Sequence, residues 1–222
     1  MFSHALRATL FASFALTAAF AQSGVTVDTP FQVRYAANLN VGDSVINITN
    51  TGARGASIYA GTSASTTGAI CVNVYAFSPD EQMIACCSCP VTPNGLVSLS
   101  AKNDLISNTL TPAVPTSIVV KLHATVPVGG SCTNSASNPD TQSTPGMLAW
   151  GTTVHAGPLS TSAPVITETP FSPATLSTSG TGGLDVGELS RLKSSCTYIN
   201  AIGSGFGICR SCRLGGLGAG RL

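Results

Sequence analysis

The fold is decided by residues Ser117–Val126, which read SIVVKLHATV. Apolar side chains recur there at every second position. Successive side chains of a β-strand point to opposite faces, and a strand that packs one face on a core shows this alternation. The segment is therefore predicted to be a half-buried strand with Lys121 and His123 outside the core. The core side chains that it predicts are Ile118, Val120, Leu122, Ala124 and Val126.

Shorter segments elsewhere in the chain show the same alternation and are separated by turn residues. They are Phe31–Ala37, Ser44–Thr49, Ile70–Phe77, Gln82–Cys87, Leu96–Ser100 and Met147–Ala156. Between two of them, Ser78–Glu81 has proline at the second position of a turn, which predicts that Ile70–Phe77 and Gln82–Cys87 form a hairpin. Many short strands without long helices between them predict a mainly β, antiparallel sandwich.

One strand and its turn resemble a known kind of module. Val41–Gly52 reads VGDSVINITNTG, which is similar to a strand and turn of the immunoglobulin-like modules of bacterial surface proteins. The resemblance implies an immunoglobulin-like sandwich and leaves the function open, because such modules serve many functions.

The amino terminus has the pattern of an export signal. Arg7 precedes an uncharged apolar run that ends in Ala19-Phe20-Ala21, which predicts a signal peptide over residues 1–21 with cleavage before Gln22. The run is too short to span a bilayer. We therefore expect a secreted, periplasmic or cell-surface protein without a transmembrane segment.

Changes in amino-acid composition divide the rest of the chain into three parts. Residues 22–157 carry the strand patterns, and residues 158–183 are rich in Pro, Ser, Thr and Gly and are predicted to be a connector. Residues 184–222 are predicted to hold one helix, with Asp185 as N-cap and Glu188 completing a capping box, and a Gly/Cys-rich tail packed on the sandwich. The apolar face of that helix carries Leu189, Leu192, Cys196 and Ile199.

The cysteines are the strongest chemical signal. In an exported chain an even number favours disulfides, although the sequence cannot select among the possible pairings. Cys86 and Cys87 are adjacent, so they are expected to have different partners. We further hypothesise that Cys71 pairs with Cys87 or Cys89, that Cys196 pairs with Cys209 or Cys212, and that the remaining tail cysteine pairs with a sandwich cysteine such as Cys132. The eight candidates are Cys71, Cys86, Cys87, Cys89, Cys132, Cys196, Cys209 and Cys212.

Two other uses of these thiols are open alternatives. Cys86, Cys87, Cys89, Cys209 and Cys212 could ligate zinc or an iron–sulfur cluster, although the first group lacks the usual C-x₂-C spacing. Cys209 and Cys212 could also act as a redox pair, but Gly-rich segments flank them instead of a strand and a helix. We expect no cofactor and no bound metal.

Signatures of catalysis and of nucleic-acid binding are absent from the sequence. It contains neither G-x-S-x-G nor a P-loop, and we assign no catalytic residue. His123 and His155 lie in predicted strands; Asp80, Glu81 and Glu168 are the carboxylates to consider for a glycosidase pair. Removal of a leader with Arg7 would leave nine basic against nine acidic residues, which gives no support for nucleic-acid binding.

Two further features have ordinary structural explanations. Trp150 is expected to be a core aromatic, with a carbohydrate platform as the alternative. Asn47-Ile48-Thr49 matches a glycosylation acceptor, but its position inside a predicted strand favours a chance match.

Three motifs together are similar to an uncharacterised family of exported bacterial proteins. They are CCSCPVTPNGL at residues 86–96, LISNTLTP at 105–112 and GSGFGICRSC at 203–212. The resemblance implies export and a single folding unit. The functional hypothesis is a non-enzymatic surface or extracellular protein that is structural, adhesive or ligand-binding, with an extracellular polymer or protein as partner. The alternatives are a secreted hydrolase acting on a polymer and a thiol-redox or metal-binding protein.

Overall fold

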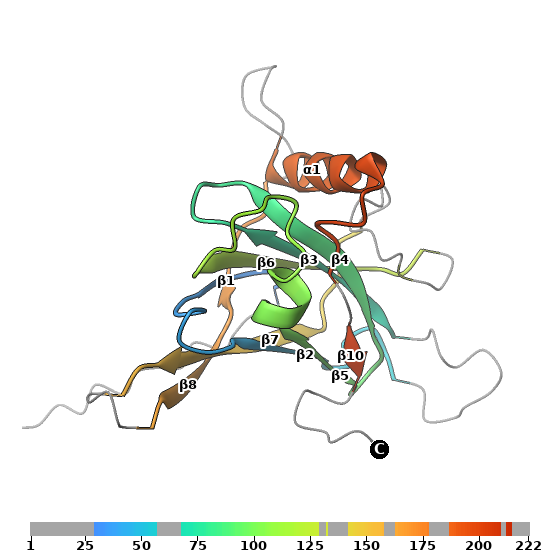
Figure 1. Cartoon of the computed structure of the whole chain (residues 1–222). Coiled ribbons are helices and arrows are strands. Elements are labelled where there is room, and N and C mark those ends of the chain that lie inside the picture. Colours follow the sequence, from blue (N-terminus) through green and yellow to red (C-terminus); the bar gives the residue numbers. More distant parts are fainter. Residues whose placement is uncertain are drawn as a thin grey trace, which may run out of the picture.

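Two antiparallel β-sheets pack face to face in the computed structural model (Figure 1). The first, sheet A, has the order β4-β3-β6-β1-β9, and the second, sheet B, has the order β10-β5-β2-β7-β8. The residues that the structure describes are 29–56, 68–128, 132, 142–157, 163–177, 187–209 and 212–214. The predicted signal peptide and its cleavage site lie outside them.

The strand bounds agree with the sequence pattern over most of the chain. Sheet A contains β1 (Phe31–Ala36), β3 (Ile70–Phe77), β4 (Met83–Val91), β6 (Ile118–Thr125) and β9 (Ser172–Pro173). Sheet B contains β2 (Val45–Asn50), β5 (Leu96–Ser100), β7 (Met147–His155), β8 (Val165–Pro170) and β10 (Arg213–Leu214). A π-helical turn, Ala101–Leu105, follows β5. Every segment predicted to be a strand overlaps one, and the predicted hairpin is the antiparallel pair β3–β4. The mainly β prediction is confirmed.

The prediction for β6 is correct on its inner face and wrong in part on its outer face. Ile118, Val120 and Leu122 are buried between the sheets, as expected. His123 is also fully buried, contrary to the prediction. The reason is a second apolar layer on the outer face of sheet A, where Phe31 and helix residues pack, and the His123 ring lies edge-on to Phe31 with their centroids 6.4 Å apart.

The predicted connector is wrong for residues 165–173, which belong to the sheets. β8 pairs with β7 along its whole length, and β9 pairs with Gln32 and Val33 of β1. Pro170 and Pro173 lie in strands at the edges of the sheets, where a missing N–H leaves no ladder bond unmade. The prolines that suggested a connector are therefore compatible with these strands.

The helix, α1, spans Glu188–Ile202 and covers the outer face of sheet A (Figure 1). Its N-cap is Gly187, so the predicted capping box is wrong; Asp185 lies outside the described residues. Gly203 ends the helix with φ of 65°, a left-handed conformation that glycine adopts without strain. Within the described residues, no helix is long and apolar enough to cross a membrane.

All eight cysteines form disulfides, and their partners follow from the faces of the strands. The pairs are Cys71–Cys132, Cys86–Cys196, Cys87–Cys209 and Cys89–Cys212. Cys86 packs with the outer layer, where α1 presents Cys196, whereas Cys87 and Cys89 belong to the core between the sheets. The expectation that Cys86 and Cys87 have different partners is thus confirmed.

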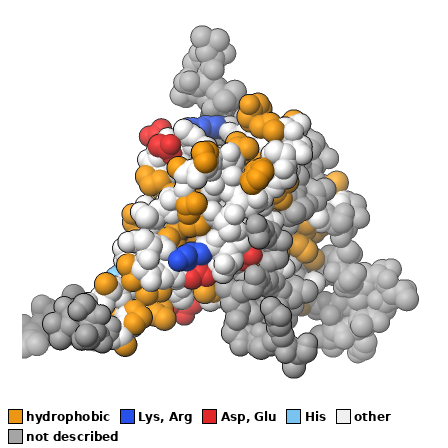
Figure 2. Space-filling model, in the orientation of Figure 1, with side chains coloured by type: hydrophobic (Ala, Val, Ile, Leu, Met, Phe, Trp, Pro, Cys, Tyr) orange, Lys and Arg blue, Asp and Glu red, His pale blue; other side chains and the backbone are white. Residues whose placement is uncertain are grey.

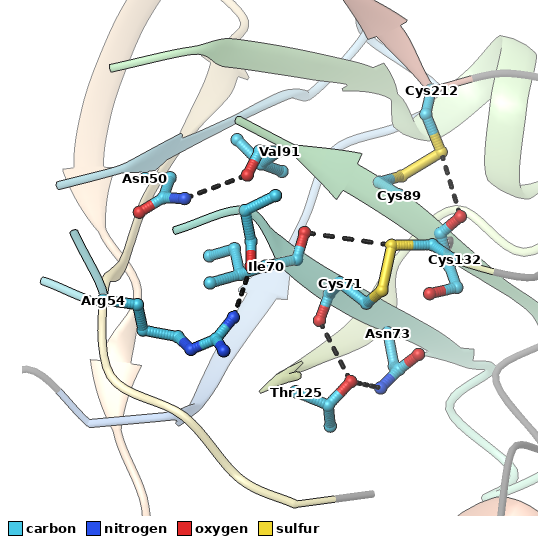
Figure 3. Close-up of a disulfide and its surroundings, with 12 residues drawn as sticks. Asn50, Arg54, Ile70, Cys71, Asn73, Cys89, Val91, Thr125, Cys132 and Cys212 are labelled. Carbon is cyan, nitrogen blue, oxygen red and sulfur yellow. Dashed lines mark hydrogen bonds between the residues drawn. A yellow bond between two sulfur atoms is a disulfide. The ribbon is translucent and has the colours of Figure 1, made fainter. Parts of the chain in front are cut away.

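The specific pairings proposed from the sequence are wrong. Cys196 bonds to Cys86 because α1 packs directly on β4, while the tail with Cys209 enters the inner core. Cys71 is opposite Pro90 in the β3–β4 register, on the other face from Cys89, and it bonds to Cys132 instead (Figure 3). Thr125 supports this site because its hydroxyl donates to the Cys71 carbonyl at 3.3 Å.

The tail closes one open side of the sandwich. Cys209 N–H donates to the Cys86 carbonyl of sheet A at 3.4 Å, and β10 pairs with β5 at the edge of sheet B, so the tail contacts both sheets. Together with the bonds of Cys87 and Cys89, this seals the side formed by β4 and β5. The opposite side, formed by β1 and the β7–β8 hairpin, is joined by polar side chains and carries a groove.

Candidate anion-binding groove around Arg34

The groove lies where the edge of β1 in sheet A faces the β7–β8 hairpin of sheet B. Its volume is about 470 Å³, within the range of small-ligand clefts. β8 and β10 lie at opposite edges of sheet B, so this groove is remote from the disulfide-closed side (Figure 1). The lining side chains are Val33, Arg34, Tyr35, Thr153, His155, Thr167, Thr169, Pro170 and Ser172.

Arg34 crosses from one sheet to the other at the floor of this groove. It lies in β1, whose inner face also carries Gln32, and the Gln32 amide donates to the Met147 carbonyl at 2.9 Å. One Arg34 terminal nitrogen donates to the Thr169 carbonyl at 2.9 Å and to the hydroxyl of the same residue. The other donates to the Thr153 hydroxyl at 2.9 Å. The guanidinium is therefore held in one orientation by sheet B.

The sequence of β7 provides the space for this side chain. Gly151 faces the sandwich interior opposite Thr169, and a Cβ at this position would lie 2.3 Å from Arg34 Nε and 2.6 Å from its Cδ. Any larger residue would displace the guanidinium. The glycine in the middle of a strand, which costs stability by itself, is thus explained by the close approach of Arg34.

The charge of Arg34 is buried without a carboxylate in contact. Only 8% of the residue is exposed, and Nε has no hydrogen-bond partner among the described residues. Burial lowers the pKa of Arg34, and the more distant charge of Glu168 acts in the opposite direction. An ion buried without a partner is costly, so a site that keeps one is a candidate for binding a charge of opposite sign.

Other groups around the groove are neutral donors or bases. His155 Nε2 lies 3.0 Å from the Thr167 hydroxyl, and Thr153 and Thr169 add further hydroxyls. Glu168 lies on the other face of β8, where it accepts from Asn47 at 3.2 Å, so no carboxylate of the described residues lines the groove. An anion in the groove would meet hydrogen-bond donors, with the negative charge of Glu168 on the far face of β8.

The described side chains of the groove include one hydroxyl beside a histidine. Thr167 and His155 are the closest approach to a nucleophile and a base, but within the described residues no carboxylate contacts His155 to orient it. A triad requires such an orienting group. Of the carboxylates considered for a glycosidase pair, Asp80 and Glu81 lie on the β3–β4 turn of sheet A and Glu168 lies in sheet B, so the structure places them on different sheets.

The structure gives no functional role to the other residues that the sequence suggested for a site, which are Trp150, Asn47 and the clustered cysteines. Trp150 is half-buried on the outer face of sheet B, so the core prediction is wrong, because Met147 and Ala149 take the inward positions of β7. Asn47 accepts from the Ser98 hydroxyl at 2.6 Å inside the sheet. The sulfur atoms of Cys87, Cys89 and Cys212 lie within 4.8 Å of one another, but all three are oxidised to disulfides.

Arg34 is not among the site residues predicted from the sequence. Its position in the predicted strand Phe31–Ala37 could have indicated it, because Arg34 lies on the same face as Gln32 and Ala36, which is the inner face in the structure. A charged residue at an inward position of a strand is rare without a partner. The partnering hydroxyls lie more than 100 residues away, which no local pattern could reveal.

Charged side chains are sparse elsewhere on the molecule. They make up 9% of the chain, and on the face shown in Figure 2 the blue and red groups are few and scattered. Comparison of the chain with protein-family models, with curated proteins and with solved structures gave no match.

Proposed function

We propose that the protein is an exported, non-enzymatic binding module whose groove around Arg34 holds an anionic group of an extracellular ligand. The observation that carries the proposal is the buried guanidinium of Arg34, which is oriented by Thr153 and Thr169 and has no carboxylate partner in the described part of the chain. A fixed guanidinium suits a carboxylate because its donors match the two oxygens.

Export is supported by the leader pattern and by the thiol chemistry. Residues 1–21 have the order of a signal peptide, and the four disulfides use every cysteine in the chain. Disulfides persist in oxidising compartments and are rare in the cytosol. A secreted, periplasmic or cell-surface location accounts for both features.

An immunoglobulin-like arrangement of the sandwich is part of the proposal. The resembling segment Val41–Gly52 forms β2 and its turn, in which Asn50 accepts from the Gly52 N–H at 2.9 Å. Rigid sandwiches of this kind present variable sites at their edges and ends, and the Arg34 groove lies at such an edge.

Binding is favoured over hydrolysis by the composition of the groove. A hydrolase acting on a polymer needs paired carboxylates or an oriented nucleophile, and the groove has neither among its described side chains. Its fixed cation and hydroxyls instead provide donors for a ligand that stays chemically unchanged.

The test measures succinate binding by calorimetry in the wild type and the variants, and follows the Nε–H resonance of Arg34 by NMR in the wild type. We expect a saturable shift of this resonance, and loss of the binding measured by calorimetry in Arg34→Gln. Arg54 provides the matched control, because it also donates to a backbone carbonyl, that of Ala69 at 2.6 Å, but lies outside the groove. Equal succinate binding by wild type, Arg34→Gln and Arg54→Gln would overturn the proposal.

A further inference from the structure

We infer that the ligand of the Arg34 groove is an extended acidic peptide, which adds as a strand to the open edge of β1. This inference rests on the proposed function and names its ligand class. It is carried by the position of Arg34 beside the only part of β1 that lacks a neighbour on one side among the described residues.

The edge of β1 is covered over only part of its length. β6 pairs with all six residues of β1, whereas β9 pairs with Gln32 and Val33 only. Beyond this point the chain leaves the sheet, because Phe171 N–H donates to Ala149 of sheet B. Among the described strands, residues Arg34 to Ala36 therefore have a neighbour on the β6 side alone.

Alternation along β1 identifies the free backbone groups. The Phe31 carbonyl accepts from Ala174 N–H on the β9 side, and the Pro30 carbonyl accepts from Ala124 N–H on the β6 side. Backbone groups of a strand alternate between its two edges, so those of Tyr35 point to the same side as those of Phe31. The N–H and C=O of Tyr35 are thus directed to the open edge, next to Ser172.

The register of an added strand would place its side chains in the groove. A residue opposite Arg34 sends its side chain to the same face of the sheet, toward sheet B, with Cβ atoms about 5 Å apart. An Asp or Glu at this position reaches the guanidinium. The next residue, opposite Tyr35, points outward beside the Tyr35 ring, which is 61% exposed.

The opposite wall favours the same ligand. Thr153 and Thr167 present hydroxyls toward the space above Arg34, and no carboxylate of the described residues lines it. Strand addition supplies affinity through backbone hydrogen bonds and specificity through alternate side chains. The groove thus fits an acidic residue followed by an apolar one in an extended chain.

The experiment measures binding of the fluorescent peptide Thr-Val-Asp-Val-Thr, with blocked ends, to the full disulfide-bonded protein. We expect at least a tenfold loss of affinity when its Asp is replaced by Asn. We also expect a scan of single backbone N-methyl groups to weaken binding at alternate positions, because only every second N–H would face β1.

The matched protein variants are Tyr35→Pro and Tyr35→Val. Proline removes the edge N–H without removing a bond to β6, and Tyr35→Val removes the same ring but keeps the N–H, so Tyr35→Pro should bind the peptide at least tenfold more weakly than Tyr35→Val. Circular dichroism identifies any unfolded variant, and the N-methyl scan on wild-type protein tests the inference independently of folding.

Other outcomes separate this inference from the function on which it rests. If succinate binds through Arg34 but the peptide shows no alternating N-methyl pattern, strand addition is wrong and the anion site stands. If the peptide binds equally well to Arg34→Gln, the acidic register is wrong, and the succinate titration alone decides the anion site.

Discussion

Gly151 of β7 leaves the space that the Arg34 side chain of β1 fills, and this allows the guanidinium to cross between the sheets. The groove therefore needs the small residue in sheet B as much as the charged residue in sheet A. Variants at these two positions can distinguish loss of binding from loss of stability.

Substitution Gly151→Ala should abolish anion binding at a moderate cost in stability. The added methyl would lie 2.3 Å from Nε, so Arg34 must leave its position, and such overpacking costs about 1 to 3 kcal/mol. The free energy of unfolding and the succinate titration measure the two effects. The double variant Gly151→Ala/Arg34→Ala removes the clash and should regain stability without regaining binding; stability no better than that of the single variant would contradict this account.

The stability of the protein should fall as the pH drops from about 6.5 to about 4. Burial lowers the pKa of His123 from 6.5 to about 4, with a smaller contribution from the positive charge of Lys193. The unfolded chain therefore binds a proton in this interval that the folded chain does not, which removes on the order of 3 kcal/mol by pH 4 and is absent above pH 6.5.

Denaturant unfolding at a series of pH values measures this effect. His123→Gln should flatten the curve of unfolding free energy against pH in this interval. A wild-type curve that is flat between pH 6.5 and 4 would show that His123 does not titrate as described.

Digestion without reduction by trypsin and a glutamate-specific protease, which cleave after Glu81, Lys102 and Lys121, should release one linked pair and one linked cluster. Cys71 and Cys132 belong to the first, and the three remaining bonds all join β4 to the carboxyl-terminal segment. Mass spectrometry shows which segments are joined. Recovery of a Cys196–Cys209 or Cys196–Cys212 fragment would refute the connectivity.

Removal of the Cys86–Cys196 bond should release α1 while the sandwich persists. The helix depends on packing of its Leu192 face and on this covalent link to β4, and a disulfide typically contributes about 2 to 4 kcal/mol. Hydrogen exchange in Cys86→Ser/Cys196→Ser should accelerate in α1 and stay slow in β6. In Cys71→Ser/Cys132→Ser, the control, α1 should keep its protection.

The amino terminus of the exported protein should be Gln22. Residues 1–21 carry the pattern of a signal peptide. Amino-terminal sequencing of material recovered outside the cytoplasm tests this, and an intact Met1 on abundant cytoplasmic protein would contradict it.

Local patterns predicted the strands because burial on one face leaves a trace in neighbouring residues. The alternation in Ile118–Thr125 and the turn before β4 are of this kind. His123 was misassigned because α1, a segment 65 residues further along, adds a second layer over an outer face that usually meets water.

Disulfide partners and the groove depend on register and on distant segments. Whether Cys89 or Pro90 faces Cys71 is decided by a shift of one residue between β3 and β4, which reverses every side chain. Arg34 likewise obtains its surroundings from Gly151, Thr153 and Thr169, which only the packing of the two sheets brings together.

The closure of the β4–β5 side has a consequence for the order of assembly. Cys87 and Cys89 precede their partners by 122 and 123 residues, so a growing chain carries these thiols for most of its synthesis. The sandwich strands other than β10 are all made before Cys209 and Cys212 arrive, but their core is open to an oxidant until then. The last step of maturation is therefore the docking of the tail. A chain that ends before Cys209 would keep Cys87 and Cys89 as two thiols facing an unsealed interior.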